Sequence, residues 1–514
     1  MARDCDVLFP AGLVCIALLT CIAAAGGRPS PGDFVRVQSS RIALKNVSVI
    51  DGTGSPVRAN QTVVIDHGRI AAAGPASQTP VPPDAQVLEL QGYTVIPGLV
   101  GMHDHLFYAA DGGRQYVSLP RAFAHLYLAA GVTSLRTAGT IDLKKDIDTK
   151  REIDEGREVG PKIHLSSPYL NAAPDIATLV RYIDTVADAG VTSLKAYTTL
   201  RRDELAAAIG AAHHRGLTVT GHLCAVGFRE AASLGIDNLE HGLIVDTEFY
   251  SRKIEDQCPD WVASAGELVS VSVDSAPIQE TIRQLVSRHV AITSTLAVFE
   301  TFAAPPASID PRVNSLFTGS ARRDYERQIE TITANRTQVA NWEAILHIEM
   351  AFERSFVKAG GLLMAGADPT GWGGVLAGLA DERNVELLVE AGFTPEEAIQ
   401  IATANGADFL REAATIGTVT PGKQADLVVI RGKLASDIRN IRHVEIVFKD
   451  GVGYDSAALM QAERGNIGNI GLSNSRWWIL GGIVAVMLLL MYVHARLTRS
   501  RSSRSSAGRG SAAR

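Results

Sequence analysis

The sequence lacks the cysteine pairs that build disulfide-rich domains and cysteine zinc sites. Of its five cysteines, three lie within the first 21 residues, and no CxxC motif is present. Cys224 and Cys258 remain in the body of the chain. We expect these two to be separate, buried small side chains. A single bridge between them is the alternative in an oxidising compartment.

Positive charge is not in excess either. The chain carries 49 Lys and Arg residues against 55 Asp and Glu residues, which gives a formal net charge of -6 at pH 7. No basic face interleaved with aromatic residues occurs in the body, so we exclude nucleic acid as a partner. With 514 residues, 46% of them hydrophobic, the chain is too apolar for disorder and long enough for one large domain with additions at its ends.

Long apolar runs are confined to the two ends of the chain. Residues 7–25 form a run that closes on small side chains, which predicts a signal peptide over residues 1–25 with cleavage after Ala25. The charge of Arg3 is offset by Asp4 and Asp6, so an uncleaved anchor is the alternative.

The second run, residues 477–493, is uncharged and begins with two tryptophans. It is near the short end of the range of about 17 to 25 residues that cross a bilayer, and it predicts a C-terminal transmembrane helix. A buried core helix is the alternative. Six arginines in residues 494–514 predict a basic cytoplasmic tail. The two ends together predict a single-pass membrane protein whose body is extracytoplasmic, that is, periplasmic or extracellular.

Between the ends, the pattern predicts two kinds of β structure. Short alternating strands over residues 26–92 and again over 411–455 predict the two parts of one composite β-sandwich. Residues 456–476 are rich in Ala, Gly, Asn and Ser, which is typical of a linker.

Residues 93–410 alternate apolar runs with helical segments, which predicts an α/β domain with a parallel sheet. Eight candidate strands are enough to close a (β/α)8 TIM barrel. They are residues 95–103, 132–137, 162–166, 191–197, 218–223, 238–241, 291–297 and 362–368. The connections 243–290 and 298–361 are longer than a barrel needs, so they are lid candidates, with packed peripheral helices as the alternative.

Catalytic groups of a TIM barrel lie at the carboxyl ends of its strands. The first candidate strand ends in an HxH motif, and because side chains alternate along a strand, His103 and His105 point to one side and can bind one ion. Lys195 lies near the end of the fourth strand in an apolar neighbourhood, where a plain ammonium is costly. A carbamate formed with CO2 would make it an anion that bridges two metals. An ordinary salt-bridged lysine is the alternative.

Three further strands end in ligand-type residues: His222, His241 and Asp368. An isolated strand-end aspartate is more often a helix cap, but six such residues at one rim suffice for two ions. We expect His103 and His105 to bind one ion with Asp368, His222 and His241 to bind the other, and Lys195 to bridge them.

These motifs resemble the amidohydrolase superfamily, in particular its imidazolonepropionase-like and prolidase-like branch of binuclear metal hydrolases. The resemblance runs from NVSVIDGTG at Asn46 through VIPGLVGMHDH, LKAY, GHL, LEHG and AGAD to GTVTPGKQADLVVI at Gly417. It implies a metal-binding set of His103, His105, carboxylated Lys195, His222, His241 and Asp368, with the flanking strands as the composite sandwich. Many relatives have Arg-Asp where this chain has Arg136 and Thr137, so the resemblance implies no role for an aspartate at this position.

The sequence also offers candidate substrate-binding residues and a candidate catalytic residue. Tyr197, Arg136 and His164 are candidate substrate-binding residues. Two divalent ions, most simply zinc, make water nucleophilic near pH 7. Asp368 is the candidate catalytic residue, which takes the proton of that water and passes it to the leaving amine.

We therefore expect hydrolysis of a peptide-like amide bond in a small molecule such as an N-acyl amino acid or dipeptide. A lactonase or phosphotriesterase, and a membrane-anchored binding or scaffold protein without turnover, are the alternatives. Self-association into a homo-oligomer stays open.

Overall fold

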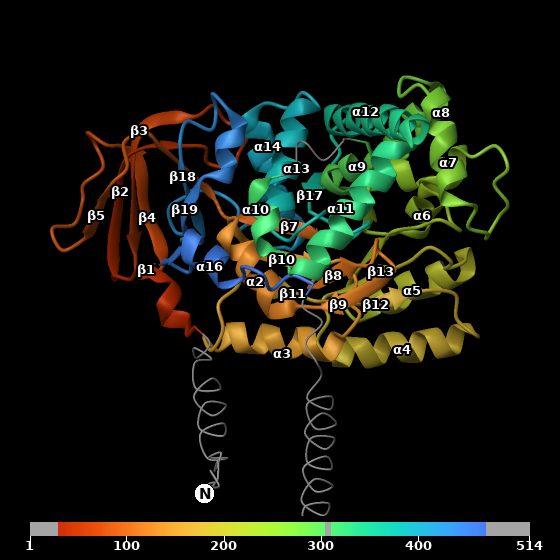
Figure 1. The fold of residues 1–514 in the computed structure, drawn as a ribbon, viewed down its shortest axis with the longest axis horizontal. Coiled ribbons are helices and arrows are strands. Elements are labelled where there is room, and N and C mark those ends of the chain that lie inside the picture. The colour runs from red at the N-terminus through yellow and green to blue at the C-terminus, as the bar shows by residue number, and fades with distance from the viewer. Residues whose placement is uncertain (1–28, 304–309, 469–514) are drawn as a thin grey trace, which may run out of the picture. The chain divides into compact units, whose positions relative to one another are not determined.

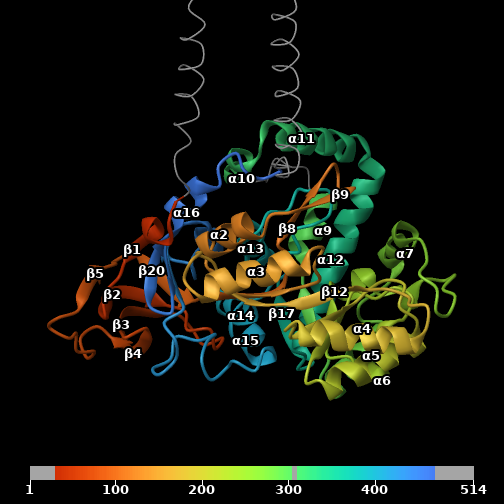
Figure 2. The same cartoon turned by 90° about the horizontal axis from the view of Figure 1, so that it is seen from below.

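Two β structures organise the chain, which a computed structural model describes over residues 29–303 and 310–468 (Figure 1). One is a mostly antiparallel sheet made from both flanks of the chain, and the other is a ring of parallel strands between them. Seen at right angles, the strands β1 to β5 again stand at one end, away from the parallel strand β12 (Figure 2).

The first structure is a nine-stranded composite sheet in the order β1-β20-β19-β18-β6-β2-β3-β4, with β5 paired to β2. Strand β18 of the C-terminal flank pairs antiparallel with β6 of the N-terminal flank, Val428 opposite Ile96. The expected sandwich is therefore one continuous sheet that joins both flanks. Its strands are β1 (Val35–Val37), β2 (Arg41–Val49), β3 (Arg58–Asp66), β4 (Arg69–Pro75), β5 (Gln86–Glu89), β6 (Tyr93–Pro97), β18 (Leu427–Arg431), β19 (Val444–Lys449) and β20 (Val452–Asp455).

The second structure is built from two arcs of parallel strands, β11-β10-β7 and β12-β13-β14-β15-β16-β17. Leu165 alone separates β11 from β12, and the Asp368 amide after β17 donates to the His103 carbonyl of β7 at 2.8 Å, so the arcs meet at both ends. The strands are β7 (Leu99–Asp104), β10 (Val132–Thr137), β11 (Lys162–His164), β12 (Ser166–Leu170), β13 (Ser193–Ala196), β14 (Thr218–Gly221), β15 (Asn238–Glu240), β16 (Ala291–Ser294) and β17 (Leu363–Ala365).

Helices connect the parallel strands, and local sequence sets where they begin. In α4, the Asp175 carboxylate caps the first turn by accepting from the Thr178 amide at 2.7 Å, while Leu179, Ile183 and Val186 form the buried face. The connecting helices are α2 (Pro120–Ala129), α3 (Leu143–Asp154), α4 (Ile176–Asp188), α5 (Arg202–His214), α6 (Phe228–Leu234), α8 (Ala276–Ser287) and α12 (Arg336–Lys358), and α13 (Leu379–Glu390) follows the last parallel strand. The others are α7 (Trp261–Glu267), α9 (Leu296–Ala303), α10 (Pro311–Leu316), α11 (Gly319–Ala334), α14 (Pro395–Ile401), α15 (Ala404–Phe409) and α16 (Ser456–Ala462).

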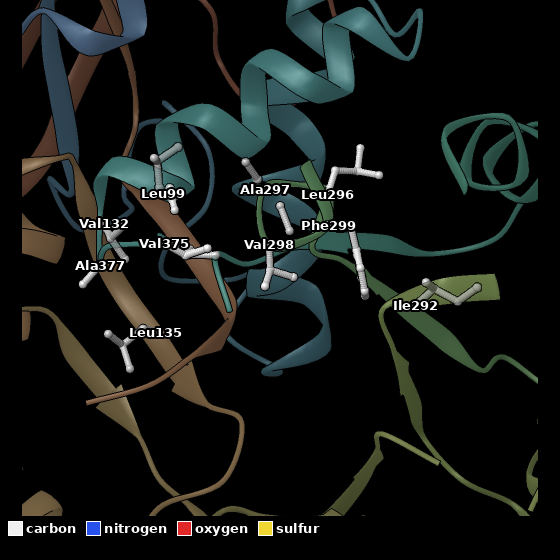
Figure 3. Close-up of a cluster of buried hydrophobic side chains, with 14 of the residues drawn as sticks. Leu99, Val132, Leu135, Ile292, Leu296, Ala297, Val298, Phe299, Val375 and Ala377 are labelled. Carbon is white, nitrogen blue, oxygen red and sulfur yellow. The ribbon is translucent and has the colours of Figure 1, made fainter. Parts of the chain in front are cut away.

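The core under the ring combines strands and helices that are far apart in sequence. Figure 3 shows Leu99 of β7, Val132 of β10 and Ile292 of β16 in one cluster with Phe299 of α9, and all four are at most 5% exposed. Each fully buried side chain of this size contributes about 1.5 to 3 kcal/mol.

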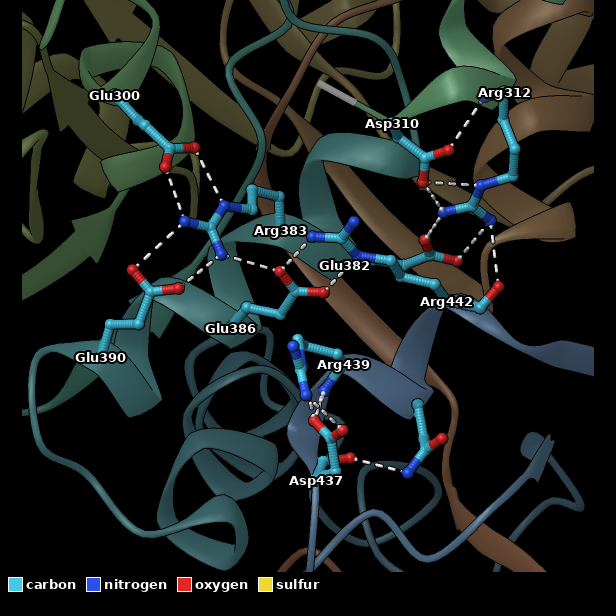
Figure 4. A network of polar contacts seen from close by, with 11 residues as sticks. Glu300, Asp310, Arg312, Glu382, Arg383, Glu386, Glu390, Asp437, Arg439 and Arg442 are labelled. Atoms are coloured by element: carbon cyan, nitrogen blue, oxygen red, sulfur yellow. Dashed lines mark hydrogen bonds and ion pairs between the residues drawn. The ribbon is translucent and has the colours of Figure 1, made fainter. Parts of the chain in front are cut away.

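An ion-pair network links α9 and α13 to the C-terminal flank (Figure 4). The Arg383 guanidinium contacts the Glu300 carboxylate at 2.6 Å, and Arg442 contacts Glu386 at 2.5 Å. Since α9 also carries Phe299, which lies against His241 with a centroid distance of 5.7 Å, this network supports a helix that packs beside the ends of the strands.

Three expectations about the connections change. Residues 243–290 hold α7 and α8, and the described part of 298–361 holds α9 to α12, so these long segments are packed helices. The segment expected as a linker begins with α16, whose Ser456 hydroxyl donates to the Ala129 carbonyl at 2.6 Å. Cys224 and Cys258, expected as separate side chains, form a disulfide with Cα atoms 4.9 Å apart. The Thr247 hydroxyl, which donates to the Cys224 carbonyl at 2.7 Å, helps to hold that segment against the turn of Cys224.

The membrane prediction is corrected. None of the helices within residues 29–303 and 310–468 has the length and apolar character that crossing a bilayer needs. The expected membrane helix at 477–493, the basic tail and the signal peptide at 1–25 lie outside the described residues. Because no membrane-spanning helix supports them, the fold class that included one and the single-pass, extracytoplasmic placement are wrong as stated. What the structure supports is a mixed α/β fold.

Candidate metal centre

Three predicted ligands meet where β7 lies beside the end of β17. The His105 Nε2 atom is 3.2 Å from Asp368 Oδ1, and His103 Nε2 is 3.7 Å from the same oxygen. One ligand atom from each of the three residues lies within 4.8 Å of the others. The histidines are 2% exposed and Asp368 7%, so this trio can hold one ion away from bulk water.

Two more predicted ligands adjoin the trio. His241 Nδ1 is 3.7 Å from Asp368 Oδ2, and its ring centroid is 4.4 Å from that of His103. His222 follows at 4.5 Å from the His241 ring and is half-buried. Four imidazoles from β7, β14 and β15 and the segments that follow them therefore gather around one carboxylate, although their assignment as ligands stays a prediction.

Lys195, on β13, is the last of the six predicted metal ligands. It is 1% exposed, and its Nζ atom makes no hydrogen bond among the described residues. The nearest carboxylate oxygen, Glu240 Oε1, is 3.6 Å away, within ion-pair but beyond hydrogen-bond distance. Burial lowers the pKa of this amine. A buried amine without a hydrogen bond is costly unless something else binds it, so the residue fits a role in holding a metal or carrying a carbamate.

Glu240 is a site residue that the sequence reasoning missed. Its Oε2 atom lies 2.7 Å from His103 Nδ1, and its Oε1 atom accepts from Arg136 Nη2 at 2.8 Å. Burial alone would raise the pKa of this carboxyl, but His103, Lys195 and Arg136 hold it well below its usual range. A carboxylate on the second nitrogen of a metal-binding histidine fixes the ring and its tautomer. That need for a partner, applied to the glutamate that directly precedes His241, was the signal available in the sequence.

The electrostatics of the site suit metal binding. Burial lowers the pKa of His103 to about 4 and that of His222 to about 3. Burial would raise the pKa of Asp368, but His103, His105 and His241 hold it well below its ordinary value. At neutral pH, His103 and His222 are therefore neutral imidazoles and Asp368 is an ionised carboxylate, and these are the forms that bind divalent cations.

The backbone is strained at two of these positions. His241 has a φ of 68° and Asp368 a φ of 46°, both in the left-handed region of backbone conformation that residues other than glycine rarely adopt. Such conformations cost of order 1–3 kcal/mol each and cluster at functional sites. Here His241 directly follows β15 and Asp368 lies three residues after β17, and their side chains are 3.7 Å apart.

The three candidate substrate residues occupy different positions. Tyr197 is half-buried, with its ring 5.2 Å from that of His222. Arg136 is 1% exposed and bonded to the Met102 carbonyl, Asn238 and Glu240, which leaves it inside the ring of strands. His164 lies 3.6 Å from a Glu412 oxygen, and among the described residues no hydrogen bond, ion pair or ring contact joins it to the histidine cluster. Tyr197 is the candidate whose ring contacts a predicted ligand.

Comparison with known proteins agrees with this arrangement. The amidohydrolase family matches residues 346–453. The chain is 23% identical over 425 residues to an imidazolonepropionase from Streptomyces griseus, covering 80% of this chain and 95% of that one. These two matches support an assignment to the amidohydrolase superfamily.

Solved structures share the fold of this chain. A prolidase-type protein from Bifidobacterium longum aligns with a TM-score of 0.60 and 24% identity, covering 82% of this chain and 99% of that one. A Xaa-Pro dipeptidase with bound methionine also aligns at 0.60, with 20% identity, covering 81% and 100%. This amidohydrolase is a hydrolase that acts on carbon–nitrogen bonds, and its superfamily generally uses divalent metals.

Proposed function

We propose that this hydrolase of small amide substrates cleaves a peptide-like bond, such as that of an N-acyl amino acid or a dipeptide, with two divalent ions. Zinc is the simplest choice for imidazole and carboxylate ligands. The observation that carries the proposal is the buried trio of His103, His105 and Asp368 beside the unbonded Lys195 amine. His222 and His241 are the proposed ligands of the second ion, and a carbamate on Lys195 is the proposed bridge.

The residues of the chain divide the chemistry among them. Divalent ions, when bound, supply Lewis acidity toward a carbonyl oxygen and toward water. Asp368 is ionised and accepts the proton of the attacking water at an Oδ atom, then delivers it to the leaving amine nitrogen. The Glu240 carboxylate keeps the Nδ1 side of His103 occupied, so its Nε2 atom faces Asp368. Burial of His103, His105 and His241 keeps bulk water away from these three side chains.

The test is turnover of a mixed panel by the purified full chain, with metal content measured in parallel. The panel holds dipeptides, N-acyl amino acids, a lactone and a phosphotriester. We expect the amide members to be hydrolysed, chelation to abolish this, and zinc with bicarbonate to restore it. Exclusive turnover of the lactone or phosphotriester would contradict the proposal.

The proton transfer is tested by Asp368→Asn. This variant should lower kcat by about 10²- to 10⁴-fold, which is the range for loss of a general acid–base. The fall in kcat should be larger than the fall in the amount of bound metal. Asp84→Asn, at an exposed carboxylate paired with Arg41, is the matched control and should leave kcat unchanged. Wild-type turnover by metal-loaded Asp368→Asn would show that another group moves the proton.

A further inference from the structure

An arc of aromatic rings borders the metal centre on one side. We call Phe107, Tyr116, Tyr169 and Tyr197 the aromatic arc. Phe107 stacks on His105 with centroids 4.5 Å apart and contacts Tyr116 at 5.1 Å. The Tyr169 ring centroid lies 6.4 Å from that of His105, and the Tyr197 ring lies 4.7 Å from that of Tyr169. Tyr197 then contacts His222 at 5.2 Å, so rings run without a break from one predicted ligand to another.

Phe107 of the arc is 2% exposed, but the three tyrosines of the arc are more exposed than the buried ligands. His103, His105 and His241 are 2% exposed. Tyr169, Tyr197 and His222 are half-buried, and Tyr116, on the hairpin strand β9 (Gln115–Ser118), is 49% exposed. A molecule that approaches the ligands from the side of the arc therefore passes over tyrosine rings.

The position of Tyr169 depends on a glycine at the end of β10. Gly139 has φ 105°, and a Cβ atom there would lie 2.6 Å from the Tyr169 ring. The absence of a side chain at this position lets the ring lie against the backbone next to His105, whose Nδ1 atom is 3.3 Å from the Gly139 carbonyl. The arc is thus held by close packing.

The arc offers hydrogen-bonding hydroxyls but no cation. In the part of the chain that the structure describes, the Tyr169 and Tyr197 hydroxyls make no hydrogen bond, although half-buried tyrosine hydroxyls usually find a partner. Cation–π contacts within residues 29–303 and 310–468 fall on other rings: Phe409, Tyr250 and Phe393. Arg114 and Arg201, near the arc in sequence, pair with Asp111 and Glu204.

We propose that the aromatic arc binds an uncharged aryl group of the amide substrate, with Tyr169 and Tyr197 donating hydrogen bonds to a neutral acceptor on it. Stacked and edge-on ring contacts favour an aryl group over a saturated ring of equal size. A carboxylate placed on the arc would lose water without gaining a cation, which is unfavourable. This inference rests on the proposed amide hydrolysis and adds the class of substrate.

The test compares three amides of alaninamide that differ only in the N-acyl group, which is benzoyl, cyclohexanecarbonyl or 4-carboxybenzoyl. Cleavage of the bond between this acyl group and the alanine nitrogen is measured. A second set carries the same rings on the amine side. The inference predicts that in one of the sets the uncharged aryl member has a kcat/KM at least tenfold above the other two. Tyr197→Leu and Tyr169→Leu should each reduce that preference about 3- to 10-fold, mainly through KM.

Matched variants separate the arc from general damage to the fold. Tyr197→Phe keeps the ring and should keep the aryl preference. Tyr182→Leu removes a tyrosine that is 38% exposed on α4 and should change nothing. If neither set prefers the uncharged aryl member, or if Tyr197→Leu and Tyr169→Leu both keep the preference, the inference is wrong while the proposed function stands.

A binding measurement tests the aromatic arc separately from the proposed amide hydrolysis. Benzamide and cyclohexanecarboxamide are titrated calorimetrically into the metal-free full chain and its Tyr197→Leu variant. Tighter binding of benzamide that is lost in Tyr197→Leu supports the arc even where no amide is hydrolysed, in which case the proposed function alone fails. Equal binding of the two ligands to the wild-type chain overturns the arc.

Discussion

The substitution Glu240→Gln tests how the centre is supported. It keeps the shape of the side chain and removes one buried negative charge. In the wild-type chain that charge lies 2.7 Å from His103 Nδ1, 2.8 Å from Arg136 Nη2 and 3.6 Å from Lys195 Nζ. All three neighbours are at most 2% exposed, so after the substitution water cannot replace the lost charge.

The expected losses follow from these contacts. Removing the carboxylate partner of a metal-binding histidine typically lowers metal affinity 10- to 100-fold. Breaking a buried ion pair on one side costs about 3–5 kcal/mol, because the remaining charge is left uncompensated. Here the Arg136 guanidinium, always protonated, has no other carboxylate within ion-pair distance among the described residues. We therefore expect the metal-free variant to be less stable as well.

Two assays separate these effects. Zinc affinity is measured by competition with a chelator, and stability by urea unfolding of the metal-free chain. Glu445→Gln is the control, since Glu445 lies on β19 of the composite sheet and pairs there with the exposed side chains of Arg36 and Arg431. Wild-type zinc affinity together with wild-type stability in Glu240→Gln would refute the reasoning.

Three further predictions concern other parts of the molecule. Burial disfavours the charged form of His125, but hydrogen bonds with Glu158 at 2.9 Å and Glu463 at 2.6 Å outweigh burial and raise the pKa of His125. The stabilisation by charged His125 is complete below the unfolded pKa of 6.5 and is lost as the pH rises through the folded pKa. His125→Leu should therefore lower the urea midpoint more at pH 6 than at pH 8.5, and an equal loss at both pH values would contradict the assignment. Cys258→Ser opens a cross-link between residues 34 apart and should cost about 2–4 kcal/mol, seen as faster proteolysis near residue 253, whereas an unchanged cleavage rate would exclude a stabilising bridge. Gly139→Ala places a Cβ atom against the Tyr169 ring at a φ of 105° and should reduce the preference for aryl amides, which is checked with the same three amides.

Much of the strand framework follows from the sequence because it is local. The run 132–137 is a strand over the same residues, and 238–241 differs from β15 by one residue. The third strand shows the limit. It was expected over 162–166, yet it is interrupted at Leu165 and continues as β12 to Leu170. Pro168, which cannot donate to a ladder, normally argues against a strand, so local pattern alone could not predict this extension.

The predicted metal ligands show which features of the site can be predicted from the position of a residue at the end of a strand, and which cannot. The rule that functional groups follow parallel strands identified His103, His105, His222, His241 and Asp368, and the structure brings these side chains together. It gave the position of each residue along its strand. It could not say which neighbours already occupy a residue, because those neighbours come from other strands.

Arg136 and Glu240 make that limit concrete. At the end of β10, Arg136 satisfied the positional rule and was expected to contact substrate. Its partner Glu240 lies 104 residues away on β15, and the same carboxylate also holds His103, 137 residues away from it. Because the Glu240 carboxylate binds the buried Arg136 guanidinium and also His103, Arg136 supports the centre, and Tyr197 stays the candidate for contact with substrate.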